Sequence, residues 1–429
     1  LVIVEGDDYE LVTDDGRRLI DGSSGLWTVN LGHSREDLVE AARKQLETLP
    51  YVATFAGVSS PPPIELAERI AGLAPPGLEG VFFVSGGSEA NETAIKLARR
   101  HWYRRGQSSR SIVLAHDRGY HGLTGVTTTA TRLQPYHGDF GADAPDIVEV
   151  PVPYTYRCAA GVPCDPATCP ICRGEVLEET IEQLGADRIA ALIVEPVFGS
   201  GGVIVPPAGY LRRLREICDR HQVLLILDEV ITGFGRTGAW FACEHEEVVP
   251  DMITFAKGVT GGYVPLGGVI VSDELWDDLR DPAQRPGVLM HGFTHSGHPV
   301  ACAVGLAVIE AIEREGLLAR VRKASQRLAD LVAPLRDHPE VGEVRQAGLM
   351  VGVEFVSDKG SRQPGPVGAG RGRRAAGEAR ERGLLTRALL DDILCLAPPF
   401  TIPDEMIARI VEILTESIEA SGGRRVEGR

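Results

Sequence analysis

The fold expected for this chain is decided by Leu224–Gly238, which reads LLILDEVITGFGRTG. Four apolar residues run directly into Asp228 and Glu229, and three glycines and an arginine follow. Such an apolar run is typical of a strand that is covered on both faces of a parallel sheet. The carboxyl ends of these strands form the ligand crevice of α/β folds, so we expect Asp228 at a binding site beside a positive partner. The simpler alternative is an aspartate that caps the next turn.

Similar apolar runs alternate with helical patterns through the middle of the chain. The runs are VFFVSG, SIVLAHD, IAALIVEP, VLLILDE, PDMITFAKG and LGGVIVSD. This alternation predicts an α/β domain with a mostly parallel central sheet over residues 61–315. Because 429 residues exceed what one hydrophobic core usually serves, a second, smaller lobe is expected as well.

The two ends of the chain, residues 1–60 and 316–429, are expected to pack together as this smaller α+β lobe. The N-terminal part contains a hairpin-like segment, YELVTDDGRRLIDG, and a helical pattern near Arg35–Leu49. The C-terminal part predicts helices over Leu317–Leu335 and from Asp404 to about Ala420, with strands around Leu349–Val356. The stretch GSRQPGPVGAGRGRR, residues 360–374, is interpreted as a flexible insertion.

Composition excludes several classes of partner. A formal net charge of −16 argues against binding to nucleic acid or to an anionic membrane, since both need a basic surface. No apolar run approaches the roughly 20 residues that a membrane-spanning helix requires. No secretory signal pattern is visible, so a cytoplasmic protein is expected.

Lys257 follows a predicted strand in PDMITFAKGVTGGYVPLGG, among glycines and apolar residues. Loss of water around a lysine disfavours its ammonium form, and the neutral amine is a better nucleophile toward an aldehyde. Lys257 is therefore a candidate Schiff-base lysine.

A pyridoxal 5′-phosphate (PLP) site would explain several other residues. Asp228 is placed to hold the pyridine nitrogen protonated. Gly87 and Ser88 lie at a strand-to-helix junction, where backbone amides bind phosphate. Tyr120, in RGYHG, would cover one ring face, and Glu195, after IAALIVEP, would lie near the ring hydroxyl. Separately, Tyr120 can be a half-buried loop aromatic and Glu195 a solvated strand end. Their order and placement together favour PLP.

The ordered motifs resemble those of class III (omega-type) aminotransferases of PLP fold type I. The motifs are SGGSEANE, GYHG, IVEPV, LDEVITGFGRTG, MITFAKG and HGFTHSGHPVACA, and the resemblance covers essentially the whole chain. It implies a PLP-dependent transaminase with a doubly wound large domain and a smaller lobe from both termini. It also implies a homodimer or higher homo-oligomer, in which the neighbouring subunit completes each active site.

The resemblance also implies roles for individual residues. Lys257 would form the Schiff base with PLP, Asp228 would pair with the ring nitrogen, and Val230 would pack opposite Tyr120. Thr294 from the other subunit would join the phosphate-binding residues. The implied cofactor-binding residues are Gly87, Ser88, Tyr120, His121, Glu195, Asp228, Val230, Lys257 and Thr294. The implied reaction is ping-pong: an amine donor leaves as a carbonyl compound, and a keto acid, pyruvate, then accepts the amino group.

Substrate preference rests on a smaller set of matched positions. The residues that match substrate-binding positions of amine transaminases are Leu26, Trp27, Phe55, Ala56 and Arg387. Arg387 would bind the acceptor's carboxylate, and its alternative is a surface arginine. Phe55 and Ala56 often come from the partner chain, and the small Ala56 would enlarge the pocket. Cys395 stands where ornithine- and GABA-type relatives carry a carboxylate-binding arginine. We therefore expect an amine or ω-amino acid donor, such as β-alanine, taurine or an aryl-alkyl amine.

The eight cysteines fall into two groups. Four are scattered in apolar surroundings and read as reduced core residues: Cys218, Cys243, Cys302 and Cys395. Four are crowded into YRCAAGVPCDPATCPICRGE: Cys158, Cys164, Cys169 and Cys172. This second group permits a zinc site, a disulfide or redox pair, or a loop of free thiols, although five residues separate its first pair. A similar loop beginning YRC occurs in some class III enzymes, which favours a family loop over a metal site. No metal is expected among the active-site residues.

Three other functions stay open from the sequence. A racemase, epimerase or aminomutase of the same family would keep the PLP residues and need no keto-acid partner. A non-catalytic PLP-binding regulator would need a DNA-binding domain, for which neither a basic helix-turn-helix segment nor spare length exists. A nucleotide-binding dehydrogenase would need a GxGxxG after the first strand, which this chain lacks.

Overall fold

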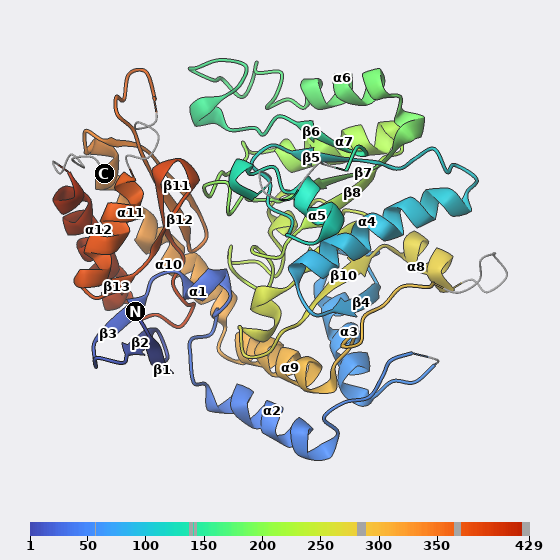
Figure 1. Cartoon of the computed structure of the whole chain (residues 1–429), viewed down its shortest axis with the longest axis horizontal. Coiled ribbons are helices and arrows are strands. Elements are labelled where there is room, and N and C mark those ends of the chain that lie inside the picture. The colour runs from blue at the N-terminus through green and yellow to red at the C-terminus, as the bar shows by residue number, and fades with distance from the viewer. Residues whose placement is uncertain (56, 137–139, 141–143, 281–288, 364–369, 423–429) are drawn as a thin grey trace.

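The computed structural model describes residues 1–55, 57–136, 140, 144–280, 289–363 and 370–422 (Figure 1). The elements of the middle of the chain gather around one large sheet, and those of both chain ends gather beside it. None of the helices that these residues form is long and apolar enough to span a membrane.

The central sheet has seven strands in the order β4-β10-β9-β8-β7-β5-β6. The strands are β4 (Gly80–Val84), β5 (Ile112–His116), β6 (Ile147–Val150), β7 (Ile189–Val194), β8 (Leu224–Asp228), β9 (Met252–Phe255) and β10 (Gly267–Val271). β10 is antiparallel to both of its neighbours, and the other neighbouring strands pair in parallel. The prediction of a mostly parallel sheet is therefore confirmed.

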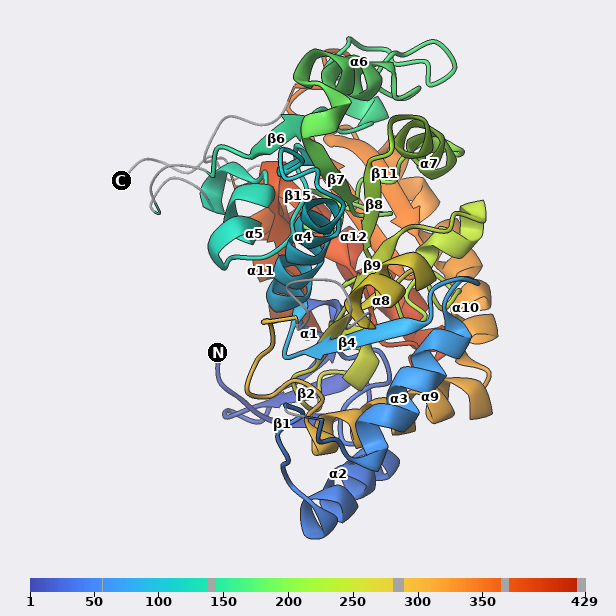
Figure 2. The same cartoon turned by 90° about the vertical axis from the view of Figure 1, so that its right-hand side faces the viewer.

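Helices cover both faces of this sheet, which explains why its strands are apolar without alternation (Figure 2). The helices of this part are α3 (Pro61–Leu73), α4 (Gly87–Arg104), α5 (Gly125–Ala130), α6 (Glu175–Leu184), α7 (Tyr210–His221), α8 (Asp273–Arg280) and α9 (Pro299–Arg314). Successive side chains of a strand point to opposite faces. In β8, Leu225 and Leu227 join the core that contains Ile217 of α7, whereas Ile226 joins the core that contains Ala94 of α4.

Strands from both ends of the chain share one smaller sheet. This sheet has the order β1 (Ile3–Asp7), β2 (Glu10–Thr13), β3 (Arg18–Asp21) and β13 (Leu384–Leu385). The predicted hairpin is formed by β2 and β3, and β13 pairs in parallel with β3, with Leu384 opposite Ile20. Because this pairing joins the N-terminal and C-terminal segments, it supports a lobe made from both ends; the boundaries at residues 60 and 315 stay a prediction.

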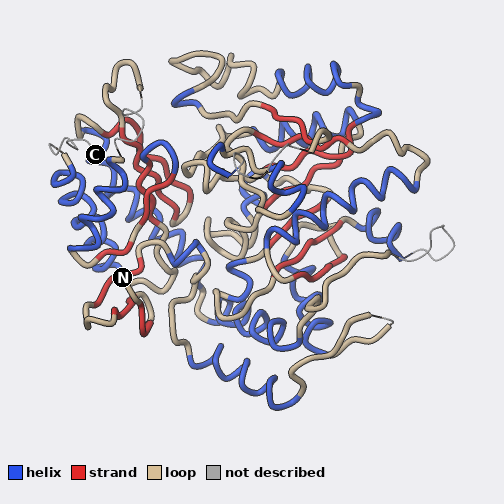
Figure 3. The backbone as a smooth tube through the Cα atoms, in the orientation of Figure 1, coloured by secondary structure: helices blue, strands red, loops and turns tan. Residues whose placement is uncertain are grey.

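A second sheet of this lobe is formed by the C-terminal segment alone. Its order is β11 (Val341–Ala347), β12 (Met350–Phe355), β15 (Ile393–Leu396) and β14 (Arg387–Leu389). The remaining helices are α1 (Ser24–Trp27), α2 (Glu36–Thr48), α10 (Leu317–Val332), α11 (Arg371–Glu381) and α12 (Asp404–Ser421). Short 3-10 helices are η1 (Gln134–Tyr136), η2 (Thr155–Arg157), η3 (Ala186–Arg188), η4 (Ala242–Glu246), η5 (Lys257–Thr260), η6 (Ala333–Asp337) and η7 (Leu390–Asp392). Figure 3 shows α11 and α12 on the side of this second sheet that faces away from the central sheet.

The prediction of a flexible insertion over residues 360–374 is wrong at its C-terminal end. Helix α11 begins at Arg371, and the carboxylate of Asp392 accepts hydrogen bonds from the backbone amides of Arg371 (3.0 Å) and Gly372 (3.2 Å). The guanidinium of Arg371 is buried, 5.2 Å from the ring of Phe355, and pairs with Glu340. The Gly/Arg composition suggested a solvated segment. The residues that bind Arg371 lie elsewhere in the sequence, so the composition of the segment itself does not reveal them. Residues 364–369 lie outside the described residues.

Arg236, in the GFGRTG turn after β8, contacts residues from both the N-terminal and the C-terminal segment of the chain. Its guanidinium is fully buried, donates to the carbonyl oxygen of Pro398 (2.7 Å) and to the side chain of Asn30, and lies 4.9 Å from the ring of Phe400. Burial lowers the pKa of Arg236 to about 9. The arginine of the opening motif therefore connects the carboxyl end of β8 to both chain ends.

Candidate active site

A cavity of about 150 Å³ lies beyond the carboxyl ends of β7 and β8, against the first turn of α4. It is lined by Gly87, Ser88, Asn91, Tyr120, His121, Gly122, Glu195, Asp228, Val230, Ile231 and Lys257. All of the predicted cofactor-binding residues except Thr294 are in this set. The structure therefore brings together side chains from five separate motifs, at the crevice that a parallel sheet predicts.

Asp228 is buried at the end of β8 and is held by three donors. Its carboxylate accepts hydrogen bonds from Nδ2 of Asn91 (2.7 Å), from Nδ1 of His121 (2.8 Å) and from the backbone amide of Val230 (3.1 Å). These bonds compensate for the loss of water around the carboxylate. The Val230 contact is the turn cap that the simpler interpretation predicted. The other two bonds orient the carboxylate toward the cavity.

The neighbouring acid, Glu229, has a different role. Its carboxylate accepts hydrogen bonds from the hydroxyl of Thr232 (2.6 Å) and from the backbone amides of Ala242 (2.7 Å) and Cys243 (2.8 Å). Burial raises the pKa of Glu229, and these hydrogen bonds oppose that effect. Glu229 does not line the cavity and anchors the start of η4 instead.

Lys257 begins η5, directly beyond β9, and its side chain opens onto the cavity. Burial of the amine lowers the pKa of Lys257 to about 8, although the carboxylates of Asp228 and Glu195 act in the opposite direction. Nζ lies 5.5 Å from the centre of the Trp27 ring and has no hydrogen-bond or ion-pair partner in the part of the chain that the structure describes. More of this amine is therefore neutral near neutral pH than of an ordinary lysine, and the neutral form is the nucleophile.

Gly87 and Ser88 form the N-terminal turn of α4, where unpaired amides favour an anion. A Cβ atom on Gly87 would lie 3.0 Å from Cγ1 of Val230, so a larger residue would push into the side chain that lines the cavity. The hydroxyl of Ser88 accepts a hydrogen bond from the backbone amide of Leu123 (3.3 Å), which ties this turn to the Tyr120 loop. The turn fits a phosphate group.

Glu195 is buried, which excludes the alternative of a solvated strand end. Its carboxylate accepts hydrogen bonds from the backbone amides of Tyr120 (2.8 Å) and Gly199 (3.0 Å). Burial raises the pKa of Glu195 to about 7, and the negative charge of Asp228 adds to the effect. Tyr120 lines the cavity, and its ring packs edge-on against Tyr136, with 5.6 Å between ring centres.

Trp27 and Arg387 lie beside this cavity. The guanidinium carbon of Arg387 lies 4.0 Å from the centre of the Trp27 ring, and the Trp27 side chain is buried. Burial lowers the pKa of Arg387, and Tyr120 and Tyr136 lie close enough to oppose that effect. Among the described residues, no carboxylate forms an ion pair with Arg387. Its charge is therefore available to a ligand.

Leu26, Phe55 and Thr294 do not line the cavity. Leu26 and Phe55 are more than half exposed, at 57% and 52%, and Thr294 is exposed as well. The carbonyl oxygen of Thr294 accepts a hydrogen bond from the hydroxyl of Tyr51 (2.9 Å) within the same chain. Ala56 lies outside the described residues. The contribution of Phe55, Ala56 and Thr294 to a partner's site stays a prediction.

Asn91 is a site residue that sequence reasoning missed. Its amide nitrogen donates to Asp228, and its amide oxygen accepts a hydrogen bond from the hydroxyl of Thr254 on β9 (2.7 Å). Asn91 lies four residues after Gly87, so the two share one face of α4. The sequence signal for Asn91 is its spacing of four residues from Gly87 in SGGSEANE, which places both on one face of a helix.

A parallel α/β sheet with a buried aspartate and an unpartnered lysine at its carboxyl edge, among the residues that the structure describes, defines a PLP-binding protein of fold type I. The family model of class III aminotransferases ("Aminotransferase class-III") matches residues 1–418, and the chain belongs to this family. Class III aminotransferases are PLP-dependent, and the protein acts as a transaminase.

Relatives and solved structures agree with this assignment. A putrescine–pyruvate aminotransferase of Pseudomonas aeruginosa is 37% identical over 97% of this chain and 90% of its own length. An (S)-enantioselective omega-transaminase structure from Thermomicrobium roseum has a TM-score of 0.94 and 42% identity, covering 99% of this chain and 93% of its own. A PLP-bound amine transaminase from an uncultivated Pseudomonas species has a TM-score of 0.93 and 40% identity, covering 98% of this chain and 95% of its own.

The residues around the cavity fit PLP. The N-terminal turn of α4 offers amides to a phosphate, and Asp228 offers an anion to a protonated ring nitrogen. The amine of Lys257 has no other partner among the described residues, as expected of a nitrogen that binds an aldehyde. The residues that fit PLP come from the start of α4 and from the carboxyl ends of β8 and β9, which are brought together by the central sheet.

The rate at which PLP-free protein covalently captures added PLP should rise with pH and reach half of its maximum near pH 8. Below that pH the amine of Lys257 is protonated and has no free electron pair to attack an aldehyde. Stopped-flow absorbance between pH 6 and 10, with the ordinary lysine value of about 10.5 as the comparison, measures the midpoint. A midpoint near 10 would contradict the lowered pKa.

Proposed function

We propose that the protein transfers the amino group of an amine or ω-amino acid to a keto acid, pyruvate, in a ping-pong cycle. The observation that carries this proposal is the guanidinium of Arg387, unpaired among the described residues, beside a cavity that already contains Lys257 and Asp228. A free cation there favours a co-substrate with a carboxylate. Support also comes from the name of the Pseudomonas aeruginosa relative, which pairs an amine with pyruvate.

Different residues of the cavity have different roles in the proposed reaction. Bound PLP supplies an aromatic ring that withdraws electrons from the substrate carbon that carries the amino group. The neutral amine of Lys257 accepts the proton of that carbon and later returns it. Asp228, held by Asn91 and His121, accepts the N–H of the ring and keeps that nitrogen positive.

The same cavity has to accept two unlike substrates in turn. A keto acid places its carboxylate on Arg387, which stacks on Trp27. An amine donor has no carboxylate at this position, so its apolar part would contact Trp27 while the guanidinium turns away. The flat indole allows either arrangement.

A donor panel tests the proposed function. Purified enzyme is supplied with aryl-alkyl amines, diamines, β-alanine, taurine and α-amino acids, each with pyruvate, and alanine formation is measured. We expect alanine from at least one amine or ω-amino acid, with the parallel initial-rate lines of a ping-pong mechanism. An α-amino acid that loses its optical activity without any keto acid would favour the racemase alternative instead.

For Arg387→Ala we expect the KM for pyruvate to rise by about 10- to 100-fold, because a charge-assisted hydrogen bond contributes about 1.5–3 kcal/mol. The half-reaction with an apolar amine should change much less, since that donor makes no ion pair. Arg409→Ala is the matched control, because Arg409 is an exposed arginine of the same lobe that pairs with Glu412 (2.6 Å) on its own helix. Equal effects on both half-reactions would remove the proposed role.

We also infer that the enzyme works as a homodimer. The support is the exposed position of Phe55 and Thr294, which match residues that relatives supply to a neighbouring site, together with the exposed apolar residues Tyr51, Val58 and Leu123. Sedimentation equilibrium should give twice the chain mass at assay concentrations. An active monomer would overturn the inference.

A further inference from the structure

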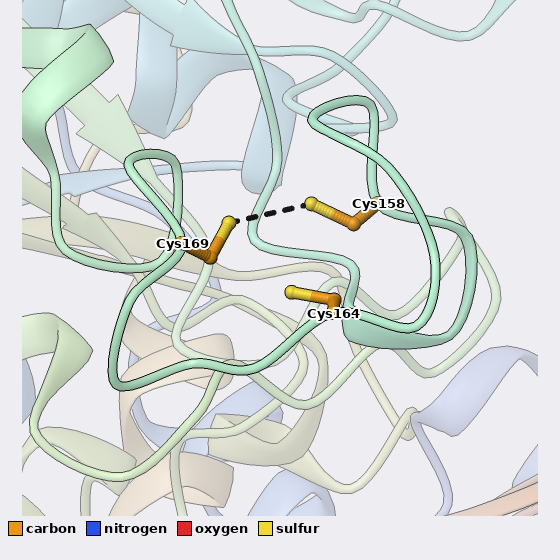
Figure 4. Close-up of side chains that lie close together, drawn as sticks. All are labelled: Cys158, Cys164 and Cys169. Atoms are coloured by element: carbon orange, nitrogen blue, oxygen red, sulfur yellow. Dashed lines mark hydrogen bonds between the residues drawn. The ribbon is translucent and has the colours of Figure 1, made fainter.

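Four cysteines lie close together in the loop between β6 and α6, outside the catalytic cavity. Figure 4 shows three of them, Cys158, Cys164 and Cys169. The Sγ atoms of Cys158, Cys164 and Cys169 all lie within 4.8 Å of one another. Cys172 adds a fourth, with its Sγ 3.7 Å from that of Cys164. All four are free thiols, and Cys158, Cys169 and Cys172 are buried. The proposed transaminase reaction uses none of them.

The spacing between these sulfur atoms matches a metal coordination shell. With Zn–S bonds of about 2.3 Å, the edges of a tetrahedral shell of four sulfurs are about 3.8 Å long. The separation between Cys158 and Cys169 is 3.5 Å, and that between Cys164 and Cys172 is 3.7 Å. A disulfide would instead need about 2.05 Å. Two of the six edges thus already have the length that one shared metal ion would impose, and the sulfur atoms of Cys158, Cys164 and Cys169 lie within 4.8 Å of one another.

We propose that Cys158, Cys164, Cys169 and Cys172 bind one structural zinc ion in a tetrahedral four-sulfur site. The sequence fits as well, because Cys169 and Cys172 form a C-x2-C pair. On binding, the four thiols release four protons to solvent, and four Zn–S bonds form. No electron is transferred, and no position is left for a substrate, so the site is structural rather than catalytic.

The zinc ion would fix the loop against the C-terminal lobe. Arg157, the residue before Cys158, donates to Oε1 of Glu354 on β12 (2.5 Å), and Glu354 also binds the buried guanidinium of Arg345. Arg345 in turn donates to the carbonyl oxygen of Gly202 (2.7 Å), in the segment that follows β7. A closed metal site would therefore hold in place one end of a hydrogen-bonded chain that joins the two lobes.

The experiment is metal analysis of the purified holoenzyme. Enzyme produced in zinc-supplemented medium is desalted into metal-free buffer and measured by inductively coupled plasma mass spectrometry. We expect about one zinc ion per chain, all of it lost in Cys169→Ala/Cys172→Ala. The matched control is Cys218→Ala/Cys302→Ala, which removes two buried thiols outside the cluster and should keep its zinc. Retention of zinc by the cluster variant would overturn the proposal.

X-ray absorption at the zinc edge of the wild-type enzyme keeps the test independent of whether the variants fold. Four sulfur neighbours at about 2.3 Å would support the proposal, and nitrogen or oxygen neighbours would overturn it. A fully reduced wild-type enzyme that takes up no zinc from a molar excess, or a Cys158–Cys169 or Cys164–Cys172 disulfide found by mass spectrometry, would also overturn it. Because the PLP absorption band and the turnover are read separately, failure of the zinc site is distinguishable from failure of the proposed function.

Discussion

Lys257→Ala is expected to reduce turnover by at least about 10³-fold. The variant would lose the amine proposed to bind the PLP aldehyde and to move the substrate proton, and general acid–base catalysis alone contributes about 10²- to 10⁴-fold. Initial rates of alanine formation measure the loss. PLP that borohydride reduction fixes to the wild-type chain before denaturation should be absent from the variant.

The control for this substitution is Lys323→Ala. The side chain of Lys323 on α10 is 81% exposed, and its Nζ lies 3.7 Å from a carboxylate oxygen of Asp404. Lys323 does not line the cavity. We expect its activity and PLP content to equal those of the wild type. A Lys257→Ala enzyme that retained more than a tenth of its turnover would show that another amine performs the chemistry. The pH midpoint near 8 would then lose its assignment to Lys257.

Asp228→Asn is expected to reduce kcat by about 10²- to 10⁴-fold. The amide has nearly the shape of the carboxylate but no charge, so the ring nitrogen loses the anion that keeps it protonated and the ring withdraws electrons less strongly. Part of the effect comes from the NH₂ group of the introduced amide, which would face the donors of Asn91 and His121. Single-turnover kinetics of each half-reaction, at saturating PLP, separate this loss from weaker cofactor binding.

Glu229→Gln provides a matched control, because Glu229 is the adjacent buried acid and does not line the cavity. Its carboxylate anchors Thr232, Ala242 and Cys243, so an amide in its place leaves a donor facing a donor. We expect a lower thermal midpoint with nearly normal turnover per folded enzyme. If Glu229→Gln lost as much kcat as Asp228→Asn, a general disturbance of the strand end, rather than the charge at Asp228, would explain both results.

Several features of the fold and site were readable from the sequence because they are encoded locally. The apolar runs of β7, β8 and β9 have no polar alternation, which indicates coverage on both faces. Asp228 is the last residue of β8 and Lys257 comes two residues after the end of β9, and the carboxyl ends of parallel strands meet at one edge. Two residues that are 29 positions apart could therefore be assigned to one cavity without coordinates.

Other features could not be read because their partners are remote in sequence. The sequence did not show that Asn91 and His121 donate to Asp228, because the helical face of Asn91 alone does not reveal this contact. Residues 371–374 looked like a flexible Arg-rich insertion, whereas Asp392 caps them as the start of a helix. For Glu195 the sequence left open a solvated strand end beside a cofactor site, because a strand end does not reveal what covers it, and the structure shows it buried.

The sequence by itself determined the fold class and identified Lys257 and Asp228 as candidate site residues, because strand periodicity and the residues that terminate strands are local properties of the chain. Only the tertiary structure decided which neighbours hold Asp228, how Arg387 stacks on Trp27, and that the sulfur atoms of Cys158 and Cys169 lie 3.5 Å apart. These contacts depend on the packing of elements far apart in sequence, and that packing minimises the free energy of the whole chain rather than of any one segment.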